Sequence, residues 1–165
     1  MEHEEYGQSF AVTVTRIDGQ WMVRAFDDDF SSLQTSVRAV RALRSEGPAF
    51  ALLCVDDDYF VIVRPTPNGI QALLSDATMA VDDDFAAEVL TELGAEIPDL
   101  DPEELDDVDG WPDGDFELLA DIGLSEEVLG VIADDEDLWP SQQLLRVAEE
   151  LGFDEELLDV TGIDD

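Results

Sequence analysis

The segment AFALLCVDDDYFVIVR, residues 49–64, decides the fold. It contains two nearly continuous apolar runs, residues 49–55 and 59–64, which are typical of central β-strands. Asp56, Asp57 and Asp58 separate the runs, and a three-residue connection is typical of a hairpin. We therefore predict two antiparallel central strands joined by an all-aspartate turn.

Further strands are predicted on both sides of this hairpin. Residues 9–16 alternate between two faces with a period of two, which indicates a strand. Asp18-Gly19 suits a type I′ turn, so residues 20–26 return as a second strand. After a turn at 65–69, the apolar residues of 69–75 predict a fifth and shorter strand.

Two helices are predicted between and after these strands. Residues 31–47 place Leu33, Val37, Val40 and Leu43 at helical spacing. Ser31 with Gln34 resembles a capping box, and Gly47-Pro48 would end the helix. The second helix begins at Asp82–Asp84 and ends at Gly94. The fold class is therefore predicted to be α+β, with a five-stranded, mostly antiparallel sheet and two helices packed on it.

The rest of the chain is predicted to differ from this sheet domain. Residues 95–114 hold nine acidic residues and three prolines, which is typical of a flexible linker. Apolar residues then recur at helical spacing in four short segments of residues 115–165, with Ser125 and Ser141 as N-cap candidates. We predict an α+β sheet domain at 1–94, an acidic linker at 95–114 and a small helical region at 115–165. The helical region could form its own bundle or fold back onto the sheet.

The net charge of −36 is very unevenly distributed. Residues 1–64 carry 11 acidic residues and six arginines, and residues 65–165 carry 32 acidic residues and one arginine. Such a field repels nucleic-acid phosphates and anionic membranes, and it attracts basic proteins or cations. No apolar run is long enough to span a membrane, and the N-terminus lacks the apolar region of a signal peptide. These features predict a cytoplasmic protein without direct contact to nucleic acid.

The three aspartate triplets, at 27–29, 56–58 and 82–84, suggest a metal site only if two of them converge in space. Consecutive side chains fan out from a strand or helix, so one triplet cannot easily surround an ion. A purely structural role explains each triplet. Asp56–Asp58 form a turn, and the other two triplets stand at helix starts, where negative charge is favoured. We therefore expect solvated acidic residues and no metal.

Other motifs lack the partners that their chemistry requires. The acidic run at 107–117 does not match the ligand spacing of a calcium loop from either start, Asp107 or Asp113. His3-Glu4-Glu5 resembles part of a zinc deaminase motif, but Cys54 is the only cysteine and the second motif is missing. We expect Cys54 to be a buried, inert thiol. No cofactor and no catalytic residues are predicted.

Two further groups of residues suggest contacts. Arg38, Arg41 and Arg44 form a stripe on the first helix that could dock the chain's own acidic half or that of a second copy. Trp111 and Trp139 each stand next to a proline in acidic surroundings, and an exposed tryptophan there could anchor a partner. Core packing is the default expectation for both tryptophans, and the exposed anchor is the alternative.

Four segments together resemble a known family. They are ALLCVDDDYFVIVRP (51–65), LLSDA (73–77), GDFELLADIGLSEEVL (114–129) and VAEELGFDEELLDV (147–160). In this order they are similar to the actinobacterial tRNA adenosine deaminase-associated proteins. The resemblance implies a link to the tRNA-editing deaminase but no catalytic residues.

These observations predict a non-catalytic, acidic binding or regulatory protein that contacts a basic partner, with the deaminase as the first candidate. The alternatives are a nucleic-acid mimic that acts on another basic protein and a metal-dependent enzyme that uses the aspartate clusters. Homodimerisation through an exposed face of the sheet is compatible with all three. The residues expected to bind the partner are Asp56, Asp57, Asp58, Asp82, Asp83, Asp84, Asp106, Asp107, Trp111, Asp134, Asp135 and Trp139.

Overall fold

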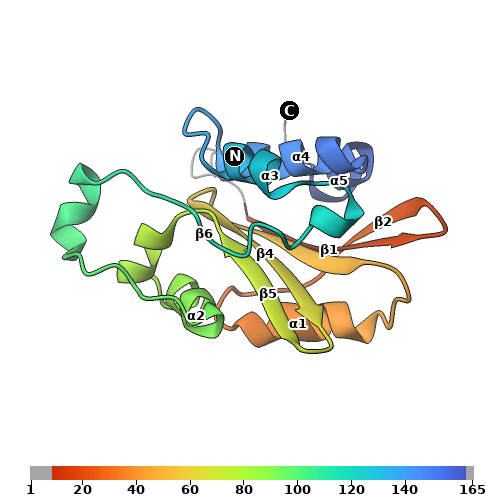
Figure 1. Cartoon of the computed structure of the whole chain (residues 1–165), viewed down its shortest axis with the longest axis horizontal. Coiled ribbons are helices and arrows are strands. Elements are labelled where there is room, and N and C mark those ends of the chain that lie inside the picture. The colour runs from red at the N-terminus through yellow and green to blue at the C-terminus, as the bar shows by residue number, and fades with distance from the viewer. Residues whose placement is uncertain (1–8, 163–165) are drawn as a thin grey trace.

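A computed structural model describes residues 9–162, apart from the side chains of Leu105 and Asp106, and arranges them in three layers (Figure 1). The middle layer is a six-stranded sheet with the order β2-β1-β3-β4-β5-β6, in which every pair is antiparallel. Helices α1 and α2 cover one face, and α3, α4 and α5 cover the other. The strands are β1 (Phe10–Ile17), β2 (Gln20–Ala25), β3 (Ala49–Val55), β4 (Tyr59–Thr66), β5 (Gly69–Leu74) and β6 (Asp113–Gly114). The helices are α1 (Leu33–Ala42), α2 (Asp84–Leu93), α3 (Glu126–Ala133), α4 (Pro140–Leu151) and α5 (Asp154–Thr161), with short 3₁₀ turns at η2 (Ala77–Val81), η3 (Pro102–Asp107) and η4 (Ala120–Ile122).

The central hairpin is confirmed. Strands β3 and β4 pair from Val55↔Tyr59 to Ala51↔Val63, and both lie in the interior of the sheet. The predicted β1–β2 hairpin also forms, with Asp18 at φ 54° and Gly19 at φ 80°, as a type I′ turn requires. The α+β class and the antiparallel sheet therefore follow from the sequence.

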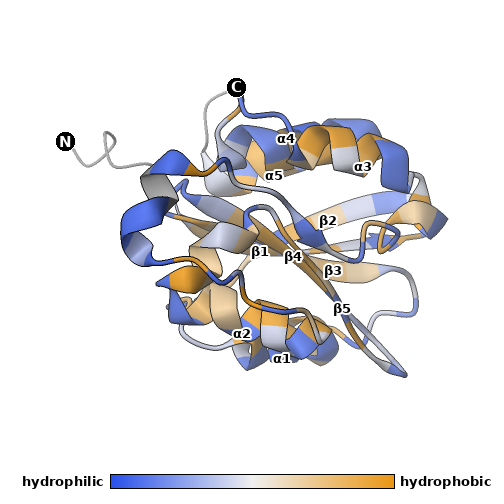
Figure 2. Ribbon diagram, turned by 60° about the vertical axis from the view of Figure 1, so that its left-hand side comes forward, coloured by the Kyte–Doolittle hydropathy of each residue, from blue (hydrophilic) through white to orange (hydrophobic). Residues whose placement is uncertain are grey.

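Two hydrophobic cores lie on opposite faces of the sheet. Side chains of a strand alternate between faces, so Phe50 and Leu52 point to α3–α5, whereas Ala51 and Leu53 point to α1 and α2. All four are fully buried. Figure 2 shows the apolar sides of both helix layers turned toward the sheet. Burial on both faces explains why residues 49–55 are apolar throughout.

The sheet has six strands, so the prediction of five was wrong by one. The additional strand, β6, lies inside the predicted linker and pairs with the end of β5 through Leu73↔Gly114 and Leu74↔Asp113. Gly114 has φ 140°, and a Cβ there would come within 2.4 Å of the Ala72 carbonyl oxygen. A strand of two residues that depends on a glycine has no apolar alternation, which is why no pattern in the sequence predicted it.

Two predicted helix starts were wrong by one or two residues. Ser32, and not Ser31, caps α1, because its hydroxyl accepts a hydrogen bond from the Gln34 N–H at 3.2 Å. Ser141 was an N-cap candidate, but Trp139 occupies that position in α4, with Pro140 as the first helical residue. Helix α1 ends at Ala42, before the predicted stop at Gly47-Pro48.

The C-terminal helices fold back onto the sheet, the second of the two arrangements considered from the sequence. Phe153 is fully buried between Trp21 of β2 and Phe50 of β3, with ring centroids 4.9 and 6.1 Å apart. On another strand, Arg64 donates to both carboxylate oxygens of Asp121 at 2.6 and 3.0 Å. The hydrogen bonds from Arg64 hold the pKa of Asp121 below its usual range.

Within residues 9–162, no helix is both long and apolar enough to cross a membrane.

Candidate functional site

The three aspartate triplets lie at the same end of the sheet. This end is where β1 and β4 begin and where β2, β3 and β5 end. Helices α1, α2 and α4 begin there as well: the Phe30 and Phe85 rings, next to the starts of α1 and α2, have centroids 6.3 Å apart. We call this region the acidic end and define it by Asp27–Asp29, Asp56–Asp58, Asp76, Asp82–Asp84 and Asp134–Glu136.

The turn between β3 and β4 projects one aspartate inward and two outward. Asp56 and Asp57 have φ of 53° and 54°, and the Asp58 N–H donates to the Val55 carbonyl at 2.8 Å. Asp57 is only 8% exposed, whereas Asp56 and Asp58 are exposed. The turn therefore presents two of its three carboxylates to solvent.

Asp57 is held by the start of α4. Its Oδ1 accepts a hydrogen bond from the Ser141 N–H at 2.8 Å, and its Oδ2 accepts one from the Ser141 hydroxyl at 3.1 Å. A carboxylate at this place satisfies a free N–H of the first helical turn and interacts favourably with the helix dipole. The turn thus caps a helix that follows 84 residues later.

A second structural carboxylate is Asp83. Its Oδ1 accepts hydrogen bonds from the N–H groups of Phe85 and Ala86, and its Oδ2 accepts one from the Tyr59 hydroxyl at 3.2 Å. This confirms the predicted N-cap of α2. Burial and the neighbouring Asp83 raise the pKa of the Tyr59 hydroxyl, so Tyr59 stays protonated as the donor.

Asp58 stands among like charges. Partial burial raises its pKa, and Asp56, Asp57 and Asp83 raise it further. Ionisation of the Asp58 carboxylate therefore costs free energy, and a nearby cation would remove this cost.

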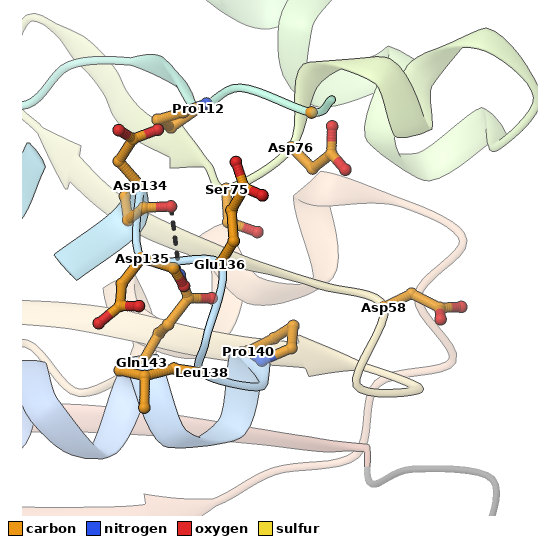
Figure 3. A pocket seen from close by; sticks show the side chains of 12 residues that line it. Asp58, Ser75, Asp76, Pro112, Asp134, Asp135, Glu136, Leu138, Pro140 and Gln143 are labelled. Atoms are coloured by element: carbon orange, nitrogen blue, oxygen red, sulfur yellow. Dashed lines mark hydrogen bonds between the residues drawn. The ribbon is translucent and has the colours of Figure 1, made fainter. Parts of the chain in front are cut away.

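Between the turn and the loop after α3 lies a hollow of about 200 Å³ (Figure 3). Five acidic residues belong to its lining: Asp58, Asp76, Asp134, Asp135 and Glu136. Its apolar walls are Pro112, Ala133, Leu138 and Pro140. Acidic oxygens over apolar walls suit the flat guanidinium of arginine or the ammonium of lysine.

Buried contacts fix the loop that forms one side of the hollow. Gln143 of α4 donates through Nε2 to the carbonyls of Ile132, Ala133 and Asp135, at 2.8, 3.2 and 3.3 Å. On the opposite side, a Cβ on Gly110 would come within 2.4 Å of the Asp76 carboxyl group. The hollow is thus shaped by positions that tolerate little change.

The predicted partner-binding residues are brought together only in part. Asp56–Asp58, Asp82–Asp84, Asp134 and Asp135 share the acidic end. Trp111 and Trp139 are 41% and 62% exposed and adjoin the walls of the hollow through Pro112 and Pro140, so core packing is wrong for both. Asp107 is exposed in η3, and the side chain of Asp106 lies outside the described part of the structure. Asp76 and Glu136 could not be selected from the sequence, because acidic residues are common in most of the chain after residue 75.

Across the described residues, no group of three or more histidine, cysteine or acidic side chains is placed to hold a metal ion. Cys54 is buried, and desolvation and Asp57 raise its pKa, so it is held as the thiol.

Replacing Asp57 and Asp58 separately by asparagine is expected to shift stability in opposite directions. Asp57→Asn weakens the cap of α4 and lowers the free energy of unfolding by about 1 kcal/mol. Asp58→Asn removes a carboxylate whose pKa is higher in the folded state, so it raises the stability at pH 7. The cost of ionised Asp58 is present above its folded-state pKa and disappears as the pH falls below its unfolded-state pKa. Denaturation with urea at pH 7 and pH 3.5 measures both effects, and a loss of stability in Asp58→Asn at pH 7 would contradict this account.

Comparison with known proteins adds the family. Residues 9–154 match the family model described as Rv3753c-like tRNA adenosine deaminase-associated protein. Protein Rv3753c of Mycobacterium tuberculosis is 51% identical over 149 residues, which cover 90% of this chain and 84% of that protein. No solved structure gives a significant match to the chain. The chain therefore belongs to the Rv3753c-like tRNA adenosine deaminase-associated protein family.

Proposed function

We propose that this protein is a non-catalytic binding protein whose acidic end contacts a basic surface, and that the tRNA adenosine deaminase carries that surface. The observation that carries the proposal is the concentration of acidic residues around the hollow, whose wall residues Pro112 and Pro140 each directly follow an exposed tryptophan in the chain. The family description supplies the candidate partner.

The arrangement has the features of a protein-binding surface. Trp111 and Trp139 offer flat apolar area next to acidic groups, and arginine side chains stack on tryptophan while they pair with carboxylates. The structural roles of Asp57 and Asp83 keep the surrounding loops in place, so little ordering is needed on binding. Their charge adds to the field, whereas Asp82, Asp84 and Asp134 present exposed carboxylates.

A surface of this kind competes with RNA. An enzyme that binds tRNA needs arginine and lysine residues that contact phosphates. The carboxylates of the acidic end would engage the same groups and would shield them from RNA. The protein would thereby lower non-specific RNA binding or limit access to the enzyme.

The test is a titration of the purified deaminase with this protein at about 50 and about 300 mM salt, conditions between which screening increases markedly. We expect association that weakens by about tenfold or more at the higher salt, because charges dominate the contact. Addition of tRNA should displace the protein. An unrelated basic protein of similar size and charge is the control: equal affinity for it would indicate a general mimic of nucleic acid and would contradict a specific partner. Absence of association at both salt concentrations would exclude the deaminase as a direct partner.

A further inference from the structure

The exposed side of α1 carries a charge opposite to that of the rest of the molecule. Arg38 and Arg41 lie on α1, and Arg44 follows the end of the helix at φ 49°. All three are exposed, and residues 30–45 contain no acidic residue, whereas the exposed Glu46 comes directly after this segment. Among the described side chains of residues 9–162, excluding Leu105 and Asp106, the ion pairs are those of Arg64 with Asp121 and of Arg146 with Glu149, so none of the three arginines pairs with a carboxylate of this set. In a protein with a net charge of −36, such a surface stands out.

The arginine stripe leads away from the acidic end. Helix α1 begins beside α2 at the acidic end and runs toward the opposite end of the sheet. There Arg41 and Arg44 line a hollow of about 460 Å³, together with Pro48, Pro65 and Pro67, and Glu46 is the single acidic residue of its lining. The molecule therefore presents a basic, partly apolar surface at one end and an acidic surface with exposed tryptophans at the other.

We propose that the arginine stripe of one copy docks on the acidic end of a second copy, so that the copies associate head to tail. The two surfaces are complementary in charge, and the acidic end offers tryptophans for the guanidinium groups. Nucleic acid is a poor ligand for the arginine stripe, because its densely charged phosphates are repelled by the negative field of the whole chain. At physiological salt the screening length is about 8 Å, so charges farther apart interact little. The contact therefore depends more on local charge pairs than on the net charges of the two copies.

The contact joins different surfaces of the two copies and does not close by a two-fold axis. Association would therefore continue to larger oligomers as the protein concentration rises, as open chains or as rings according to the rotation between copies. It would also cover the surface used in the proposed function, and in this respect the inference rests on that proposal. A high concentration of the protein would limit its own binding to the partner.

Sedimentation velocity of the purified protein over a wide concentration range at about 150 mM salt tests the docking. The variant R38Q/R41Q/R44Q removes the arginine stripe, and D82N/D84N/D134N/E136Q weakens the acidic end without changing Asp57 or Asp83. Arg146→Gln is the matched control for a lost surface arginine, since Arg146 lies on α4 and pairs only weakly with Glu149 at 3.6 Å. We expect concentration-dependent association of the wild type and of the control, and dissociation constants higher by about tenfold or more for both multiple variants.

Mixing the two multiple variants gives the decisive result. One retains the arginine stripe and the other retains the acidic end, so together they should form a 1:1 complex that grows no further. A wild type that is monomeric at every concentration, a stripe variant that associates like the wild type, or a mixture without the 1:1 complex would each overturn the proposal. None of these measurements involves the deaminase, so failure here is distinct from failure of the proposed function.

Discussion

Replacement of Phe153 by alanine is expected to lower the free energy of unfolding by about 3–5 kcal/mol. Phe153 is fully buried and touches Trp21 and Phe50, so it joins the start of α5 to two strands. Truncation removes a large apolar side chain and leaves a cavity between the helices and the sheet. Because domains of this size are stable by only about 5–15 kcal/mol, much of the native stability would be lost.

The same variant tests whether the C-terminal helices are a separate unit. The sequence predicted a sheet domain at 1–94 and a helical region at 115–165, and that division stays a prediction. Since both helix layers share one sheet, we expect helix and tertiary signals to be lost in one transition, monitored by far-UV circular dichroism and tryptophan fluorescence during urea denaturation. Val131→Ala on α3 is the control, because Val131 is 71% exposed and its truncation should change stability little. Two separate transitions in Phe153→Ala would favour the division into two regions.

The elements that could be predicted from the sequence are those with local signals. The runs at 49–55 and 59–64, the Asp18-Gly19 turn and the Asp83 cap are local patterns, and the structure confirms each of them. The strand β6 could not be predicted, because its two residues pair with β5 some 40 positions away along the chain. Strands β3 and β4 are apolar on both faces, and this pattern did indicate a second helix layer. A sheet that is buried on both faces needs a layer of helices on each face.

The acidic end shows where sequence reasoning stops. The triplets could be assigned to a turn and to helix starts, yet the role of Asp57 depends on Ser141, which lies far away in sequence. Asp57 and Asp58 are the same residue type in adjacent positions, but one is buried by its partners and the other is exposed. Only the fold distinguishes carboxylates that hold the loops from carboxylates that are free for a partner.

Neutralising the free carboxylates of the acidic end is expected to have the largest effect on partner binding. The variant D82N/D84N/D134N/E136Q removes four exposed charges and leaves Asp57 and Asp83, with their hydrogen bonds, in place. If each carboxylate pairs with a basic group, about 0.2–1 kcal/mol is lost per pair, which corresponds to a total of about fourfold to several hundredfold in affinity. The slope of affinity against salt concentration should also decrease, because fewer charges are screened.

A control with equal net charge separates a local surface from a general field. Glu117, Glu127, Glu150 and Glu155 are exposed and belong to segments outside the acidic end, so their combined replacement by glutamine removes the same four charges elsewhere. If the acidic end is the contact, this control should weaken deaminase binding by about twofold or less at physiological salt, where distant charges are screened. Equal losses in the two variants would show that net charge alone drives association, and the hollow of the acidic end would then have no special part in recognition. Isothermal titration calorimetry of both variants, with thermal unfolding to confirm that each is folded, distinguishes these outcomes.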